Sequence, residues 1–291
     1  MLYQQQIPAL VRMLKGRSAQ LFHACQLQDF RSYLQLGGIP SRAVLERSGL
    51  PFTAFKTDQN DRTNGVWEKV FANLNDFGEA FADGDRAPPN AYGPILLRMR
   101  PDALHSVDDV AVAVKSAGGR GFNRERESLK SVAEVDWLFA YPASVGHPRS
   151  NRLKFRKALR AVHRDAETPE VSFTLQNGVL PLSHVSSIVV DPYVLDGRPL
   201  VDTVRQDLAA LGCAARCQQR SIFRDPGRKP LYAELQACLA SGVPSLVGLY
   251  RSADSSPGLR IWADGMLTYD LEWQYRRYAQ YLRTGTIDLC L

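Results

Sequence analysis

The sequence predicts an α+β protein with a C-terminal α/β extension. Short apolar segments separated by polar loops fill residues 1–195, and residues 170–175 alternate with the period of two that is typical of a strand. The pattern changes after residue 196, because the apolar side chains of residues 199–211 fall on one helical face. We therefore expect two domains, a main domain over residues 1–195 and an extension of unknown role over residues 196–291.

The composition is that of a globular protein with a sizeable core. Of the 291 residues, 45% are apolar and 23% are charged. The net charge of +6 favours a polyanionic partner, although a basic protein without such a partner has the same composition. Five scattered cysteines suit a reducing compartment, and Cys213 and Cys217 lack the second ligand pair of a zinc site, so no metal is expected. Without a signal peptide or a membrane-spanning run, the expected location is the cytoplasm.

Residues 21–42 combine a strand, a helix and a glycine turn. Leu21–His23 forms an apolar strand end, and Asp29 can cap the helix that follows. Gly37-Gly38 stops this helix, since glycine tolerates left-handed geometry. Residues 39–42 then leave in an extended conformation.

The other helices and strands are predicted from the spacing of apolar residues and from the turn-forming residues between them. We expect helices over residues 8–19, 43–49, 199–211, 229–240 and 272–283. We expect strands over residues 92–100, 110–114, 170–175, 186–191, 246–250 and 259–268. Residues 56–65 are rich in turn formers and read as a structureless polar loop that holds Arg62.

A basic segment precedes residue 170. Residues 152–164 carry no acidic side chain, and the usual interpretation of such a segment is a solvated face of an amphipathic helix. A loop of this kind with an aromatic residue also suits a nucleic-acid strand. The candidate nucleic-acid-binding residues are Arg152, Lys154, Phe155, Arg156, Lys157 and Arg160.

Two groups of residues resemble DarT-type ADP-ribosyltransferases, toxins that attach ADP-ribose to nucleic acid. The family opens with an aromatic-His pair, an Asn-Leu pair, a helix ending in Gly-Gly, and a Ser-Arg pair. Its late motif is a glutamate at the head of a strand, followed by a tail of spaced isoleucine and valine. The matching residues here are Phe22-His23, Asp29-Phe30, Gly37-Gly38, Ser41-Arg42, Glu170-Val171 and Val179–Val190, with Asp29 in place of the family's Asn.

This resemblance covers roughly residues 20–192 and implies a core of two packed, mostly antiparallel sheets around an NAD cleft. It implies NAD as the substrate and Glu170 as the catalytic carboxylate, which would hydrogen-bond the ribose 2′-hydroxyl and stabilise an oxocarbenium-like transition state. A solvent-facing strand carboxylate is the alternative for Glu170. Arg62 would hold the pyrophosphate or orient the acceptor base, whereas most arginines in polar loops are only solvated.

The resemblance also implies NAD-binding residues. His23 would bind a ribose or the nicotinamide amide, Arg42 is the second candidate for the pyrophosphate, and Tyr92 could line the cleft. The alternatives are a structural histidine and a core aromatic residue. The full set is His23, Asp29, Gly38, Arg42 and Tyr92.

The expected activity is transfer of ADP-ribose from NAD onto a base of single-stranded DNA or RNA, because a base must be unstacked to be modified. The resemblance implies a toxin of a toxin–antitoxin or anti-phage system, with an antitoxin or chaperone as protein partner and no membrane. Two alternatives remain open: the same fold acting on a protein side chain or hydrolysing NAD, and a non-catalytic nucleic-acid-binding module.

Overall fold

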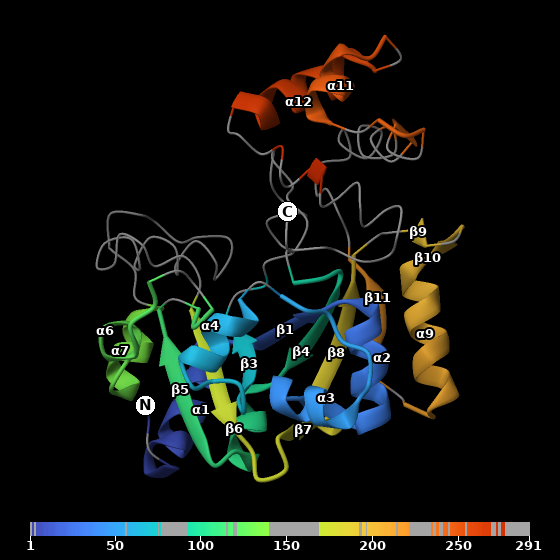
Figure 1. Cartoon of the computed structure of the whole chain (residues 1–291). Coiled ribbons are helices and arrows are strands. Elements are labelled where there is room, and N and C mark those ends of the chain that lie inside the picture. Colours follow the sequence, from blue (N-terminus) through green and yellow to red (C-terminus); the bar gives the residue numbers. More distant parts are fainter. Residues whose placement is uncertain are drawn as a thin grey trace. The chain divides into compact units, whose positions relative to one another are not determined.

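Short helices and strands make up the computed structural model of this chain (Figure 1). The structure describes residues 2, 4–55, 57–74, 76, 92–114, 116–118, 121–139, 169–191, 194–195, 197–213, 215–220, 234, 237–238, 241–243, 245–253, 255–268, 272 and 275–276. The described helices are η1 (Gln4–Gln6), α1 (Ile7–Gly16), α2 (Leu27–Leu36), α3 (Arg42–Ser48), α4 (Asp58–Thr63), η2 (Pro101–Ser106), α6 (Arg124–Glu127), α7 (Val132–Trp137), η4 (Leu182–His184), α9 (Leu200–Ala210), α11 (Leu246–Arg251) and α12 (Pro257–Thr268).

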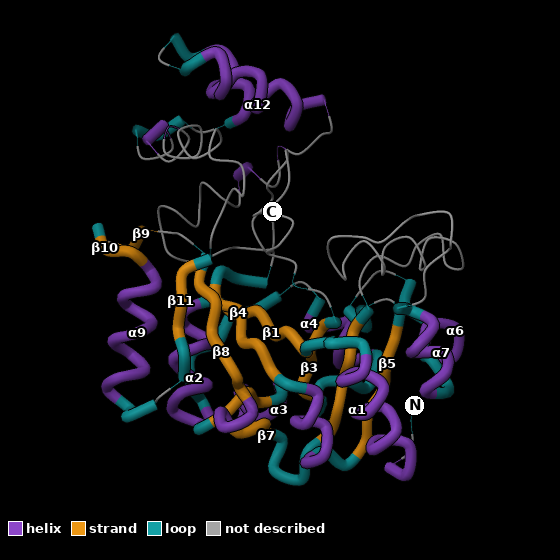
Figure 2. Tube along the Cα trace, turned by 180° about the vertical axis from the view of Figure 1, so that it is seen from behind, coloured by secondary structure: helices purple, strands orange, loops and turns teal. Residues whose placement is uncertain are grey.

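The strands form one large sheet and two small ones. They are β1 (Leu21–Cys25), β2 (Gly38–Pro40), β3 (Val70–Asn73), β4 (Ile95–Met99), β5 (Asp109–Ala113), β6 (Glu170–Thr174), β7 (Val179–Pro181), β8 (Val185–Val190), β9 (Val194–Leu195), β10 (Arg198–Pro199) and β11 (Cys217–Gln219). The seven-stranded sheet has the order β11-β8-β4-β1-β3-β6-β5, and β2-β7 and β9-β10 form two-stranded sheets (Figure 2).

This topology confirms a mixed α+β fold with a large, mostly antiparallel sheet. Strand β3 pairs antiparallel with β1 and β6, and β5 pairs antiparallel with β6, whereas β8 and β11 run parallel. The second of the two packed sheets that the resemblance implies is represented, in the described residues, only by two-stranded ladders.

The chain divides into two compact units, described separately below. Unit 1 comprises residues 1–23, 28–76 and 97–187, and unit 2 comprises residues 24–27, 77–96 and 188–291.

Unit 1 is organised around the antiparallel strands β1, β3, β6 and β5. Figures 1 and 2 show α1 on one face of β3, β6 and β5 and helix α4 on the other. Buried apolar side chains of α1 recur at helical spacing and pack against η2 and α7, which follows from the expected amphipathic pattern. Ser41 caps α3 through the amide of Val44, and Gly49 ends α3 with a φ of 68°, so the predicted helix over residues 43–49 is confirmed.

In unit 2, helix α9 confirms the predicted helix over residues 199–211, since Leu200, Val204 and Leu208 are all buried on one side. The predicted strands over residues 246–250 and 259–268 are wrong, because α11 and α12 occupy them and pack on each other. The side chain of Ser245 accepts a hydrogen bond from the Gly248 amide and starts α11. A short apolar run is compatible with a strand or with a buried helix. The capping serine favours the helix here. Most of the predicted helices over residues 229–240 and 272–283 lies outside the described residues.

Candidate active site

Glu170 is the first residue of strand β6 and lies near the centre of the unit 1 sheet. It stands opposite Asn73 of β3 and Ala113 of β5. Asn73 in turn stands opposite Phe22 of β1. Glu170, Asn73 and Phe22 therefore form one row across the three strands, and His23 is the residue after Phe22. The side chains that the two halves of the motif supply therefore come from neighbouring parts of one sheet.

The Glu170 carboxylate is buried and held by two donors. Only 8% of the residue is exposed. The Ser116 hydroxyl donates to Oε2 across 2.7 Å, and the Ala117 amide donates to Oε1 across 3.0 Å. Burial raises the pKa of Glu170, and the two hydrogen bonds oppose that rise. The alternative of a solvent-facing strand carboxylate is wrong.

The loop of residues 116–118 that holds Glu170 is itself fixed by helix α4. The Asn64 side chain donates to the Ala117 carbonyl across 2.7 Å, and the Asn60 side chain donates to the Gly118 carbonyl across 3.0 Å. A Cβ at Gly118 would lie 2.8 Å from Cβ of Thr57, so only glycine lets the helix approach this closely. Helix α4, the loop and Glu170 thus form one connected group.

Asp61, on the same helix, is a second perturbed carboxyl group. Burial raises the pKa of Asp61 to about 7, and the charges of Glu170 and Asp58 add to the rise, whereas Arg42 opposes it. A group whose pKa lies near neutrality can accept or release a proton at physiological pH, which an ordinary aspartate cannot do.

His23 is held in one tautomer by two contacts. Its Nδ1 lies 2.6 Å from the Phe71 carbonyl of β3, and its Nε2 lies 3.0 Å from the Tyr33 hydroxyl of α2. A carbonyl can only accept, so Nδ1 carries the proton, and Nε2 accepts from the tyrosine. Loss of hydration lowers the pKa of His23 to about 4, because this outweighs the hydrogen bond to Phe71. The ring is therefore neutral at physiological pH.

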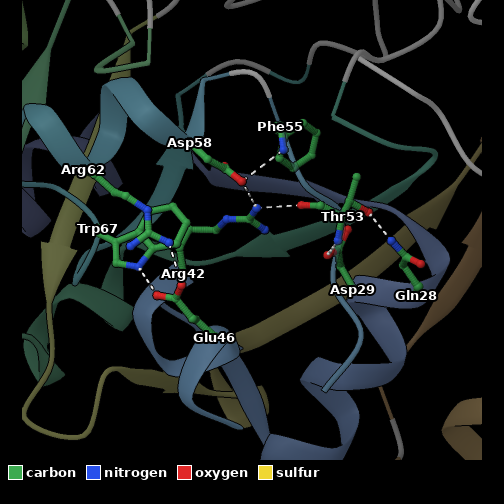
Figure 3. A network of polar contacts seen from close by, with 9 residues as sticks. All are labelled: Gln28, Asp29, Arg42, Glu46, Thr53, Phe55, Asp58, Arg62 and Trp67. Atoms are coloured by element: carbon green, nitrogen blue, oxygen red, sulfur yellow. Dashed lines mark hydrogen bonds and ion pairs between the residues drawn. The ribbon is translucent and has the colours of Figure 1, made fainter. Parts of the chain in front are cut away.

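Arg42 is the centre of a polar network that Figure 3 shows from close by. Its guanidinium donates to the Thr53 carbonyl across 2.6 Å and to Asp58 across 2.7 Å, and only 11% of its side chain is exposed. It also lies over three aromatic rings at 4.7–5.6 Å from their centroids, those of Phe52, Phe55 and Trp67. Arg42 is the first residue of α3, so the predicted extended conformation of residues 39–42 holds as far as Ser41, the extended residue that caps α3.

Arg62 lies at the outer side of this network. Its guanidinium carbon is 3.7 Å from the Trp67 ring centroid, and it pairs with Glu46 across 2.7 Å. Glu46 also accepts from the Trp67 indole, and Figure 3 shows the three side chains together. The predicted structureless loop is wrong here, because Arg62 belongs to helix α4. None of the side chains of this helix is fully buried, and polar contacts hold it in place. Its sequence therefore has no apolar periodicity that would predict a helix.

Asp29 and Gly38 both have structural partners. Asp29 is buried in the first turn of α2, and its carboxylate accepts from the Thr53 amide across 2.7 Å. The predicted helix cap at Asp29 is therefore wrong, since α2 begins at Leu27 and the carboxylate bonds a distant amide. A Cβ at Gly38 would lie 2.2 Å from the Leu180 carbonyl, so glycine is needed where β2 meets β7. Gly37 ends α2 with a φ of 73°, as predicted.

The remaining candidates lie outside the described residues of unit 1. Tyr92 belongs to unit 2 and is 38% exposed, so the alternative of a core aromatic residue is wrong. The basic segment over residues 152–164 lies outside the described residues and stays a prediction. In the part of the chain that the structure describes, no three His, Cys, Asp or Glu side chains group as a metal site would need.

Sequence reasoning missed the residues that hold Glu170 and the second carboxyl group. A backbone amide has no sequence signature, but a run of small residues directly after a strand is a weak signal for a loop that presents its amides. The missed residues are Tyr33, Asn60, Asp61, Asn64, Trp67, Ser116 and Ala117.

Comparison with known proteins finds no matching family model and no matching curated protein. Among solved structures, this chain is similar to Thermus sp. 2.9 DarT in complex with ADP-ribosylated ssDNA (TM-score 0.40, 14% identity, covering 71% of this chain and 94% of that chain). The same DarT with NAD+ gives a TM-score of 0.40 at 12% identity over 69% and 95% of the two chains, and with carba-NAD+ a TM-score of 0.39 at 11% identity over 71% and 96%.

These comparisons confirm the resemblance to DarT as a distant structural likeness. No helix in the described part of the chain is long and apolar enough to cross a membrane.

Proposed function

We propose that this chain transfers ADP-ribose from NAD onto a base of single-stranded DNA or RNA, and that it acts as a toxin in a toxin–antitoxin or anti-phage system. The observation that carries the proposal is the Glu170 carboxyl, which is buried at the start of a strand and fixed by Ser116 and Ala117. The late motif of the family has its glutamate at the same position of a strand. Perturbed carboxyl groups of this kind cluster at functional sites.

The reaction needs no covalent bond between the protein and the substrate. Cleavage of the bond between nicotinamide and ribose passes through an oxocarbenium-like transition state, which a nearby carboxylate stabilises. An ionised carboxylate has about four lone-pair positions, and the hydrogen bonds from Ser116 and Ala117 use two of those of Glu170. The remaining positions can accept from the ribose 2′-hydroxyl. A carboxylate in a poorly hydrated site acts more strongly on developing charge than one in water.

The other candidates support this carboxylate in different ways. Both ring nitrogens of His23 already have partners, so His23 would present the Tyr33 hydroxyl to NAD or bind NAD after that hydroxyl moves. Arg42 holds Asp58 and Thr53 and would shape the cleft as a positioning residue. Arg62 is 41% exposed and would reach the pyrophosphate by exchanging its partner Glu46 for phosphate oxygens.

The choice of a nucleic acid as acceptor is supported by charge and by the resemblance. A net charge of +6 raises the local concentration of a polyanion. The basic segment, residues 152–164, directly precedes Glu170 in the sequence, where the wider family recognises its substrate. An unpaired strand offers bases that need not be extruded from a duplex.

The test is incubation of the full chain with NAD labelled on its adenylate phosphate and with separate pools of single-stranded DNA, RNA and protein. We expect label on a nucleic-acid pool, and we expect Glu170→Gln to abolish it. The matched control is Glu68→Gln, since Glu68 is an exposed glutamate that pairs with Arg47 in the same unit. Label only on protein, or only free ADP-ribose, would replace this proposal by one of the two enzymatic alternatives. Intact NAD would leave a non-catalytic binding module.

A further inference from the structure

We propose that Asp61 is the general base of the transfer, which takes the proton that the acceptor nitrogen or oxygen loses when it bonds to the ribose. This inference rests on the proposed function and adds a residue that the motifs do not contain. It assigns two different tasks to two carboxyl groups that both lie beside the loop of residues 116–118.

The position of Asp61 places it beside the group that holds Glu170. Its Oδ1 lies 3.2 Å from the point that a Cβ at Gly118 would occupy. Gly118 follows Ala117, whose amide binds Glu170. Two hydrogen bonds fix helix α4 to this loop. Asn60 and Asn64, on either side of Asp61, donate to the carbonyl groups of Gly118 and Ala117. Asp61 is therefore fixed close to the carboxylate that would bind the reacting ribose.

The surroundings of Asp61 leave its carboxylate available for a proton. Among the described residues, no hydrogen bond or ion pair engages that carboxylate. The charged groups around it are Asp58 on its own helix, Glu170 on β6 and Arg42 on α3, and Arg124 of α6 binds the nearby Asn64 carbonyl. Two carboxylates and partial burial outweigh the single arginine and raise the pKa of Asp61 to about 7.

Glu170 is poorly suited to the same task. It must remain ionised to stabilise the positive charge of the ribose, and although burial raises its pKa, two donors oppose that rise and occupy both of its oxygens. Asp61 has no such donors, and a base whose pKa lies near the working pH transfers protons most effectively. Environments that separate the behaviour of two carboxyl groups assign the acid–base roles in other enzymes as well.

The transfer breaks one bond to C1′ of the ribose and forms another. The bond from C1′ of the ribose to nicotinamide breaks, and its electron pair leaves with nicotinamide as a neutral molecule. A lone pair of the acceptor forms the new bond to C1′. The proton on the acceptor moves to the Asp61 carboxylate and later passes to water.

The experiment compares wild type, Asp61→Asn and Glu170→Gln between about pH 5 and about pH 9, and measures label transfer and NAD hydrolysis separately. We expect Asp61→Asn to slow transfer about 100-fold and to remove the rise of wild-type transfer through about pH 7, while hydrolysis to water falls far less. Glu170→Gln abolishes both reactions. Asp102→Asn, an exposed aspartate paired with Lys15, is the matched control and keeps the wild-type profile.

Thermal unfolding gives a readout that needs no substrate. The folded pKa of Asp61 lies above its ordinary value of 3.8, so its ionisation lowers the free energy of unfolding as the pH rises from about 4 to about 7. Asp61→Asn removes this loss. We expect its Tm to exceed that of wild type at about pH 8 and to match it at about pH 4.

The outcomes are distinguishable. Transfer by Asp61→Asn within about twofold of wild type, or a wild-type transfer rate that is flat from about pH 6 to about pH 8, overturns the inference and leaves the proposed function intact. A lower Tm for Asp61→Asn at about pH 8 indicates that Asp61 only supports the first turn of α4, which also overturns it. A wild-type chain that does not cleave NAD overturns both the inference and the proposed function.

Discussion

Asn64 and Ala117 join helix α4 to the loop that holds the central carboxylate. The Asn64 side chain donates to the Ala117 carbonyl across 2.7 Å, and the amide of Ala117 donates to Glu170 across 3.0 Å. The backbone of a single residue thus accepts one hydrogen bond from the helix and donates one to the carboxylate. Any movement of the helix therefore changes the position of Glu170.

This relationship predicts the effect of Asn64→Ala. Loss of the side-chain amide frees the loop, and a displacement of about 1 Å at a reacting group can slow a reaction up to about 100-fold. We expect NAD cleavage to fall between about 10-fold and about 100-fold, whereas the free energy of unfolding falls by only about 1 kcal/mol. Steady-state kinetics and urea unfolding measure the two quantities. Gln59→Ala, an exposed position on the same helix, is the control and changes neither. Equal losses in both variants would mean that the helix as a whole, and not this hydrogen bond, sets the rate.

The tautomer of His23 predicts a specific titration. Because the folded pKa of about 4 lies below the ordinary 6.5, the neutral ring is favoured in the folded state, and the free energy of unfolding falls as the pH drops from about 6.5 to about 4. Nitrogen-15 spectra of labelled histidine should show a proton on Nδ1 and a midpoint near 4. Tyr33→Phe removes a hydrogen bond that only the neutral ring accepts, so it raises that pKa slightly, while burial keeps it well below 6.5. A wild-type midpoint at the ordinary value would contradict the geometry around His23.

The buried pair of Arg42 and Asp58 predicts a large loss of stability. Arg42→Ala leaves the Asp58 carboxylate without its cation and removes the contacts with the three aromatic rings, so we expect about 3 kcal/mol of destabilisation. Arg42→Lys keeps the charge but loses the planar fork, and it recovers only part of this. The exposed pair of Arg47 and Glu68 is the control, because Arg47→Ala costs less than about 1 kcal/mol. Similar unfolding midpoints for Arg42→Ala and Arg47→Ala would rule out a supporting role for Arg42.

The strands of the core were predictable because burial leaves a period in the sequence. Residues 170–175 alternate with the period of an extended chain and residues 188–190 form a continuous apolar run, and both predicted strands are confirmed. Helix α3 was predictable from Gly49, which tolerates the left-handed turn that ends it. Helix α4 was not predictable, because none of its side chains is fully buried. Its position depends on hydrogen bonds to residues elsewhere in the chain.

The site was predictable only in part for the same reason. Glu170 and His23 carry recognisable motifs, but the donors to Glu170 lie more than fifty residues away in sequence, and one of them is a backbone amide. The task of Arg42 was also hidden, because sequence alone cannot tell an arginine that binds an anion from one that already holds Asp58. Partners that meet only through the fold are not visible in spacing along the chain.

The contact between Gly38 and Leu180 predicts the outcome of a single added methyl group. A Cβ at Gly38 would lie 2.2 Å from the Leu180 carbonyl, which belongs to backbone and cannot turn away as a flexible side chain could. Strand β2 would have to separate from β7, and its pairing of Gly38, Ile39 and Pro40 would be lost. We expect Gly38→Ala to lower the free energy of unfolding by about 3 kcal/mol, since overpacking against fixed atoms is among the costliest substitutions.

Gly16→Ala is the matched control, because no atom lies within 4 Å of a Cβ at that position and alanine is favoured over glycine in a helix. The measurement is urea unfolding of both variants beside wild type. Since the strand that holds Gly38 runs directly into Ser41 and the start of α3, its displacement also moves Arg42. Gly38→Ala should therefore reduce NAD cleavage as well as stability, whereas Gly16→Ala leaves cleavage unchanged. A Gly38→Ala variant as stable as wild type would show that β2 and β7 can move apart without loss, and that the glycine at this position is not required by the ladder.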